Sequence, residues 1–118
     1  MKSIVLVVED DPLISMWVEE SLREAGYIVL CANNADAAIR LLEIRTDIHL
    51  VFTDIDMPGS MDGLKLAAFV RGRWPPMRIV VASGKHRPHP GELPADVVFL
   101  PKPYLTGDVL RAFGSFSR

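Results

Sequence analysis

The feature that most constrains the fold is an uninterrupted apolar run near the amino terminus, Ile4 to Val8. Five consecutive aliphatic residues without polar alternation predict a strand buried on both faces, as in a parallel sheet with helices on each side. The chain then becomes wholly acidic at Glu9-Asp10-Asp11. Carboxylates at the carboxyl end of a central parallel strand lie where open α/β sheets bind ligands. Because clustered carboxylates repel one another, this arrangement favours a bound cation.

Length and composition limit the chain to one small domain. Its 118 residues, nearly half of them apolar, suffice for a single packed core, so we expect one domain over residues 1–118. The net charge of −2 gives no electrostatic case for nucleic acid. The single cysteine, Cys31, cannot form an internal disulfide, and we interpret it as a small buried residue. The apolar run is too short for a signal sequence or a membrane span. We therefore expect a cytoplasmic protein with no nucleic-acid or membrane partner.

Strand-like and helix-like segments alternate along the chain, which predicts βαβ units and an α/β fold. The strands are expected at residues 4–8, 27–32, 50–53, 78–82 and 97–100. The helices are expected after Asp11, after Asn33 or Asn34, from 64 to 74, and from 106 to 116. These segments predict a flavodoxin-like, doubly wound, five-stranded parallel sheet with strand order 2-1-3-4-5.

One crossover departs from this rhythm. The segment between Ser83 and Val97 contains Pro88, Pro90, Gly91 and Pro94 where a fourth helix is expected. A proline inside a helix costs about 3 kcal/mol. We therefore predict a shortened or irregular fourth helix of at most one or two turns.

Polar side chains stand at the ends of the four adjacent strands. The first ends in Glu9 and Asp10, the third in Asp54, the fourth in Ser83 and the fifth in Lys102. Clustered carboxylates suit Mg²⁺, which prefers oxygen ligands and keeps several waters. A carboxylate can also attack a phosphoryl group and form an acyl phosphate. An ammonium and a hydroxyl beside it would neutralise and hydrogen-bond the transferred group.

The chain resembles the receiver domains of two-component response regulators. The resemblance is carried by five blocks in the family's order: Val7-Val8-Glu9-Asp10-Asp11-Pro12, Thr53-Asp54-Ile55-Asp56-Met57-Pro58, Met61-Asp62-Gly63, Val81-Ala82-Ser83-Gly84 and Leu100-Pro101-Lys102-Pro103. One departure is the turn between Met57 and Gly63, which has Gly59-Ser60 where one residue is usual.

The resemblance implies a role for each position. It implies that Asp54 is the phosphoacceptor and that Glu9 and Asp10, with Asp54, hold Mg²⁺ or Mn²⁺. It implies that the backbone carbonyl of Asp56 is a further metal ligand and that Lys102 contacts the phosphate. It also implies that Ser83 and Phe99 are the switch residues, which move on phosphorylation. It also implies a cis peptide bond between Lys102 and Pro103, since the free-energy cost of a cis bond is small only before proline.

Two hypotheses concern residues around this site. Asp56 and Lys85 each stand two residues beyond a site residue, so they could flank the phosphoryl group and modulate how fast water reaches it. Met16 and Trp17 lie on the first expected helix, which could help to dock the phosphodonor. The donor that the family implies is a sensor histidine kinase or a histidine phosphotransfer protein.

The residues and the resemblance together predict a stand-alone signalling switch that is phosphorylated. We expect no enzymatic activity beyond its own phosphorylation and dephosphorylation. Since no output domain follows the last expected helix, output would be a protein contact with an unknown downstream partner or a phosphorelay. The alternatives are a receiver excised from a longer hybrid kinase or regulator, a Mg²⁺-dependent phosphatase with an aspartyl nucleophile, and a flavodoxin-like cofactor binder. The phosphatase would usually need a cap domain, and the acidic residues after the first strand would repel a flavin phosphate.

Overall fold

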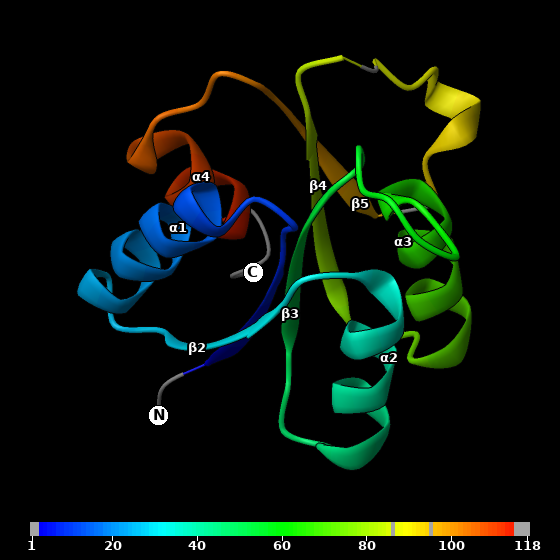
Figure 1. The fold of residues 1–118 in the computed structure, drawn as a ribbon, viewed down its shortest axis with the longest axis horizontal. Helices are drawn as coiled ribbons and strands as arrows, with labels where there is room; N and C mark the ends of the chain where they lie inside the picture. The colour runs from blue at the N-terminus through cyan, green and yellow to red at the C-terminus, as the bar shows by residue number, and fades with distance from the viewer. Residues whose placement is uncertain (1–2, 86, 95, 115–118) are drawn as a thin grey trace.

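The protein is a three-layer α/β sandwich in which helices cover both faces of a parallel sheet (Figure 1). This computed structural model describes residues 3–85, 87–94 and 96–114. The strands are β1 (Ile4–Val8), β2 (Ile28–Ala32), β3 (Leu50–Asp54), β4 (Arg78–Ser83) and β5 (Val97–Pro101). The helices are α1 (Pro12–Glu24), α2 (Ala35–Ile44), α3 (Gly63–Arg73) and α4 (Thr106–Gly114), with one short 3-10 helix, η1 (Pro90–Glu92).

The sheet has the order β2-β1-β3-β4-β5, and every pair of neighbouring strands is parallel. This confirms the predicted topology. The register pairs Val8 with Thr53 and Asp54 with Ala82, so the strands end nearly level with one another. All five residues of β1 are buried, as expected for a strand covered on both faces. Consequently, the residues that follow β1, β3, β4 and β5 share one edge of the sheet.

Two apolar layers hold the sheet between its helices. Helices α1 and α4 lie on one face, while α2 and α3 lie on the other (Figure 1). On the first face, Val18 and Leu22 of α1 pack with Val5 and Val7 of β1. On the second, Leu66 of α3 belongs to the cluster that includes alternate residues of β1 and β4. The period-two alternation of a strand therefore supplies both layers from a single apolar run.

Each of the first three helices begins at a polar cap. The Asp11 carboxylate accepts hydrogen bonds from the backbone N–H groups of Leu13 and Ile14, and Pro12 occupies the first helical position. Asn34 caps α2 and Asp62 caps α3 in the same way. Such caps typically contribute about 1 kcal/mol each.

The crossover between β4 and β5 is irregular, as predicted. Within its described part, η1 is the regular element, and the salt bridge between Arg71 of α3 and Asp96 (2.8 Å) ties its end to the body of the domain. Every residue of β5 is half-buried, whereas the neighbouring β4 is almost wholly buried. The proline-rich crossover thus covers its sheet edge less completely than a full helix would.

Some expectations differ from the structure, and one extends beyond the described residues. Cys31 is exposed on the edge strand β2, so its interpretation as a buried residue is wrong. The third helix begins at Gly63 rather than Leu64, and it ends one residue earlier than expected. The last helix is expected to reach residue 116, and its final two expected residues lie outside the described part of the chain. Among the described residues, the helices are too short or too polar to cross a bilayer.

Gly63 brings the start of α3 directly against the end of β3. Its N–H donates to the carbonyl of Ile55 at 2.9 Å. A Cβ atom on Gly63 would collide with the Asp54 carbonyl group and would lie 2.7 Å from the Ile55 Cα. This close approach requires glycine, and it places the α3 amino terminus beside the Asp54 backbone.

The substitution Gly63→Ala should lower the free energy of unfolding by about 1–3 kcal/mol, because the added methyl group overpacks the contact with the Asp54 backbone. Gly72→Ala is a matched control in the same helix, since a Cβ there meets open space. The control should leave stability unchanged or raise it by up to about 1 kcal/mol. Urea unfolding followed by circular dichroism measures both. Equal effects of the two substitutions would contradict the steric explanation.

Candidate functional site

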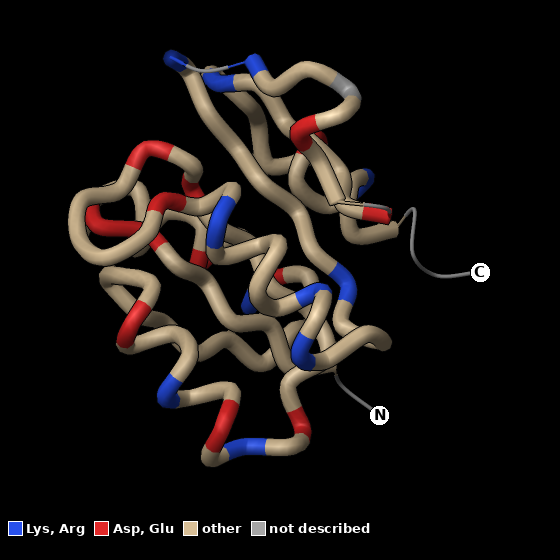
Figure 2. The backbone as a smooth tube through the Cα atoms, turned by 90° about the vertical axis from the view of Figure 1, so that its right-hand side faces the viewer, with Lys and Arg blue, Asp and Glu red and all other residues tan. Residues whose placement is uncertain are grey.

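Acidic side chains gather at the carboxyl edge of the sheet. Figure 2 shows several acidic segments close together in the loops on one side of the molecule. Glu9 follows β1, Asp10 follows Glu9, and Asp54 is the last residue of β3. Glu9 and Asp54 are buried, with 4% and 5% of their surfaces exposed, whereas Asp10 is exposed. One carboxylate oxygen from each of the three lies within 4.8 Å of the other two.

This donor set fits a hard divalent cation. All three ligand atoms are carboxylate oxygens, which Mg²⁺ and Mn²⁺ prefer over nitrogen or sulfur. The two buried carboxylates fix one side of the group, while Asp10 faces solvent. Because Mg²⁺ keeps part of its water shell, a site that is open on one side suits it.

Lys102 lies beside the acidic group. Its Nζ atom is 3.3 Å from Asp54 Oδ1 and 3.8 Å from Glu9 Oε1. The peptide bond between Lys102 and Pro103 is cis, as the resemblance implied. One ammonium cannot neutralise three carboxylates, so the cluster keeps an excess of negative charge.

Burial raises the pKa values of the two inner carboxyl groups. The pKa of Glu9 rises to about 7, mainly because burial disfavours its charged form, with the Asp54 charge adding to the effect. Hydrogen bonding to the Asp11 backbone N–H and the charge of Lys102 oppose this rise. Burial also raises the pKa of Asp54, and Lys102 opposes it. Two adjacent carboxylates therefore ionise at an energetic cost that a bound cation would relieve.

A second set of contacts joins the ends of β3 and β4. Ser83, the buried last residue of β4, donates its hydroxyl proton to Asp56 Oδ2 at 2.6 Å. The backbone N–H of Lys85 donates to Ser83 Oγ at 3.2 Å, and that of Asp56 donates to Asp54 Oδ1 at 3.4 Å. Asp56 and Lys85 also line a hollow of about 370 Å³. The structure thus connects Asp56 to both Asp54 and Ser83.

Phe99 lies farther from the acidic group, in the middle of β5. It pairs with Val81 in the strand register and packs against the apolar cluster on the α2 and α3 face. Its side chain is half-buried. Since Val81 and Ser83 are two residues apart on one strand, Phe99 lies on the same face of the sheet as Ser83.

The sequence interpretation did not single out Tyr104, which the structure places at this edge. Its ring packs against Trp17 and, edge-on, against Phe52. Its hydroxyl is buried and lacks a hydrogen-bond partner among the described residues. Burial raises the Tyr104 pKa, and the charges of Glu9 and Asp54 raise it further. An aromatic residue directly after Lys102-Pro103 was the available sequence signal.

The inserted residues of the β3–α3 turn are accommodated at its tip. Gly59 has φ of +112°, which favours glycine, and Ser60 donates a hydrogen bond to Asp36 of α2 at 2.7 Å. This contact ties the longer turn to α2 rather than to the acidic group.

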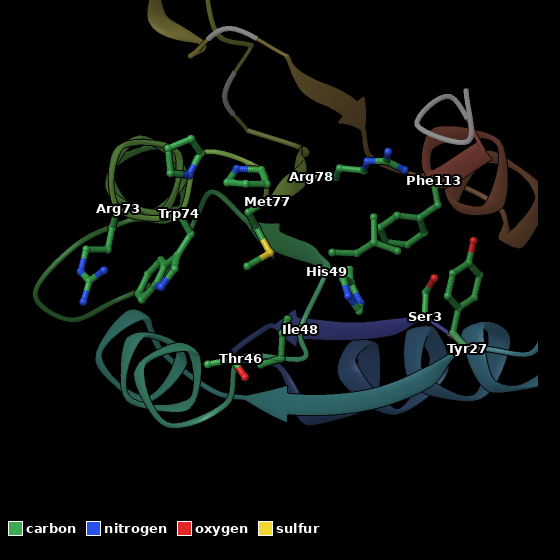
Figure 3. Close-up of a pocket in the computed structure, with 13 residues that line it drawn as sticks. Ser3, Tyr27, Thr46, Ile48, His49, Arg73, Trp74, Met77, Arg78 and Phe113 are labelled. Atoms are coloured by element: carbon green, nitrogen blue, oxygen red, sulfur yellow. The ribbon is translucent and has the colours of Figure 1, made fainter. Parts of the chain in front are cut away.

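A separate hollow lies at the opposite edge of the sheet (Figure 3). Its volume is about 740 Å³, and Trp74, His49 and Arg78 are among the residues that line it. Arg78 is the first residue of β4, whereas Ser83 is the last. This hollow is therefore separate from the acidic cluster, and none of the predicted site residues lines it.

The comparisons with known proteins agree with this architecture. Residues 5–92 match the response regulator receiver domain family. The chain is 44% identical over 73 residues to the transcriptional regulatory protein AruR of Pseudomonas aeruginosa, a match that covers 58% of this chain and 30% of AruR. A response regulator receiver protein from Sinorhizobium medicae superposes with a TM-score of 0.88 at 27% identity, covering 97% of this chain and 93% of that one. The response regulator TrrA of Thermotoga maritima, solved in complex with Mg²⁺-BeF, gives a TM-score of 0.85 at 27% identity and covers 98% of both chains.

The fold and its acidic edge define a receiver domain, the signalling module of two-component systems. The chain belongs to the response regulator receiver domain family, because the family match spans most of its length. Receiver domains bind Mg²⁺ at an acidic site and accept a phosphoryl group. The chain spans less than a third of AruR, so AruR's activity as a whole protein is not transferred to it.

In metal-free protein, the free energy of unfolding should fall as pH rises from about 5 to 8. The folded-state pKa of Glu9, about 7, lies above its ordinary value of 4.5, so in this window the folded state binds more protons than the unfolded state. Raising the pH removes that advantage, and the loss should be roughly 1–3 kcal/mol. Urea unfolding at several pH values in the presence of a chelator measures it.

Glu9→Gln should flatten most of this slope, whereas Glu20→Gln on the exposed face of α1 should leave it unchanged. A stability that rises with pH over the same window, or a slope that survives in Glu9→Gln, would contradict the assignment.

Proposed function

We propose that the chain is a phosphoacceptor switch in which Asp54 receives the phosphoryl group. The observation that supports this most strongly is the placement of Asp54, which is buried, lies in one group with Glu9 and Asp10, and has Lys102 Nζ 3.3 Å away. Glu9, Asp10, Asp54 and the Asp56 backbone carbonyl would hold Mg²⁺. When bound, the cation would supply positive charge to the phosphoryl oxygens.

In the proposed reaction, a carboxylate oxygen of Asp54 attacks the phosphorus of a phosphohistidine on the donor. A new O–P bond forms, the N–P bond breaks, and its electron pair returns to the imidazole nitrogen. Lys102 pairs with the phosphoryl oxygens, and Ser83 donates a hydrogen bond to them. Hydrolysis reverses the change, because water attacks phosphorus and the Asp54 carboxylate leaves with the electron pair of the O–P bond.

The remaining assignments complete this proposal. Residues 1–118 act as one receiver domain in the cytoplasm, with no catalytic activity beyond their own phosphorylation and dephosphorylation. Ser83 and Phe99 respond to the modification, and Asp56 with Lys85 flanks the group and affects its lifetime. The phosphoryl donor is a sensor histidine kinase or a histidine phosphotransfer protein. The output is a protein contact or a further phosphotransfer.

Acetyl phosphate with Mg²⁺ should add one phosphoryl group to the protein, and peptide mapping should locate it on Asp54. Asp54→Asn should abolish the mass gain, because an amide oxygen is a far weaker nucleophile. Lys102→Ala should slow the gain by about 10²-fold or more, since it removes the ammonium beside the reacting oxygen. Intact-protein mass spectrometry follows all three. A mass gain that persists in Asp54→Asn would overturn the proposal.

An exposed apolar surface beside the site is the proposed docking surface for the donor. It consists of Leu13, Met16 and Trp17 of α1 and Leu105 before α4, with 75%, 55%, 40% and 74% of their surfaces exposed. Trp17 also contacts Tyr104, whose hydroxyl lies in the field of Glu9 and Asp54. Because α1 begins at Pro12, directly after the acidic residues, this surface starts next to the acidic edge that a donor's phosphohistidine would have to reach.

Trp17→Ala should slow phosphotransfer from the cognate donor protein by about tenfold and leave phosphorylation by acetyl phosphate nearly unchanged. Large exposed aromatic residues are frequent anchors of protein contacts, whereas a small donor needs no such anchor. Ile44→Ala on α2, which is 77% exposed and lies on the other face, is the matched control. Equal slowing with both donors would show that Trp17 supports the site itself and not docking.

A further inference from the structure

The hydroxyl of Ser83 is directed to Asp56 in the structure. Ser83 is only 2% exposed, and its Oγ atom lies 2.6 Å from Asp56 Oδ2. The backbone N–H of Lys85 donates to the same oxygen at 3.2 Å. A serine hydroxyl carries one proton. While that proton is donated to Asp56, it is not available to a phosphoryl oxygen on Asp54.

The contact with Asp56 is of the strong, charge-assisted kind. An O–H group that donates to an ionised carboxylate at this distance makes a shorter and stronger bond than one between neutral partners. The Asp56 backbone is restrained as well, because its N–H group donates to Asp54 Oδ1 at 3.4 Å. Asp56 therefore touches the acceptor carboxylate through its backbone and the hydroxyl through its side chain.

The Asp56 side chain borders a hollow that could accommodate it in a second position. It lines the hollow of about 370 Å³ whose other walls include Lys85, Met57 and Pro58. Lys85, whose side chain carries a positive charge, is exposed and is one of the residues that line this hollow. A carboxylate that left Ser83 would thus meet open space and a positive charge.

We propose that Asp56 is a positioning residue that restrains the Ser83 hydroxyl in the unmodified protein, so that the phosphoryl contact already assigned to Ser83 forms only by exchange for Asp56. This inference rests on the proposed role of Asp54 as phosphoacceptor. The phosphoryl group brings a charge of about −1.5 to −2, which attracts the hydroxyl proton and repels the Asp56 carboxylate toward Lys85. Ser83 gains a new acceptor, and Asp56 gains a new cationic partner.

The exchange predicts that Asp56 slows phosphoryl acceptance through Ser83. In the unmodified protein, the hydroxyl can donate to an incoming phosphoryl group only in the fraction of molecules in which the Asp56 contact is broken. Removing the acceptor should raise that fraction and speed phosphorylation by about tenfold. A simple loss of charge near the site would also speed the reaction, so the test has to separate the two causes.

The experiment compares the rate of phosphorylation by acetyl phosphate in wild type, Asp56→Ala, Asp56→Asn, Ser83→Ala and the double variant Asp56→Ala/Ser83→Ala. Asp56→Asn loses the charge but keeps a neutral and weaker oxygen acceptor for the hydroxyl, so its rate should lie between those of wild type and Asp56→Ala. Asp56→Ala should be phosphorylated about tenfold faster than wild type, and this gain should vanish when Ser83 is also alanine.

NMR of the magnesium-free proteins adds a readout that does not depend on reactivity. The Ser83 side chain should hold one χ1 rotamer in wild type and Asp56→Asn and average over several in Asp56→Ala.

Three results would overturn the inference: an unchanged rate in Asp56→Ala, the same acceleration with and without the Ser83 hydroxyl, or a Ser83 rotamer that does not respond to Asp56→Ala. Failure of wild type to accept a phosphoryl group would instead contradict the role of Asp54, and the rotamer measurement would still decide whether Asp56 restrains Ser83.

Discussion

The electrostatic repulsion among Glu9, Asp10 and Asp54 is the constraint on which the site depends. Two of these groups are buried, and burial raises the pKa values of both. Lys102 supplies one compensating charge at 3.3 Å from Asp54. The parallel sheet supplies the opposing stability, because the apolar strands that carry the acids are buried on both faces. The fold therefore holds together charges that would separate in a free chain, and it prepares them for a cation and a phosphoryl group.

The same geometry connects the acidic group to a responsive element. Asp56 follows Asp54 by two residues, so one short turn carries both the proposed acceptor and the side chain that binds Ser83. The close approach of Gly63 fixes the far end of that turn against the Asp54 backbone. A phosphoryl group on Asp54 would therefore add negative charge close to the hydrogen bond between Ser83 and Asp56, and this charge would favour breaking it. This proximity is a physical basis for a switch that shifts between two pre-existing arrangements.

Much of the architecture was predictable because the strands and their ends carry strong, local signals. The run from Ile4 to Val8 predicted a strand covered on both faces, and the expected strand order placed its acidic end beside the end of the strand that carries Asp54. The prolines between β4 and β5 likewise forecast the loss of a full helix. These inferences needed only backbone periodicity and topology.

The rest depended on side-chain rotamers and on tertiary contacts that a linear pattern does not encode. Nothing in the spacing of Asp56 and Ser83 indicates which acceptor the hydroxyl selects. The Tyr104 ring packs against Trp17 and Phe52, which buries a hydroxyl that has no hydrogen-bond partner in the part of the chain that the structure describes. Cys31 was misjudged because edge strands expose residues that central strands would bury.

Line broadening by Mn²⁺ in NMR spectra tests the central claim, that the acidic group binds a divalent cation, most directly, since the paramagnetic ion broadens the resonances of the residues nearest to it. The account predicts that trace Mn²⁺ broadens the amide resonances of Asp10, Asp54 and Asp56 first and that excess Mg²⁺ restores them. Broadening centred on other acidic residues, such as the exposed Asp47, would contradict it.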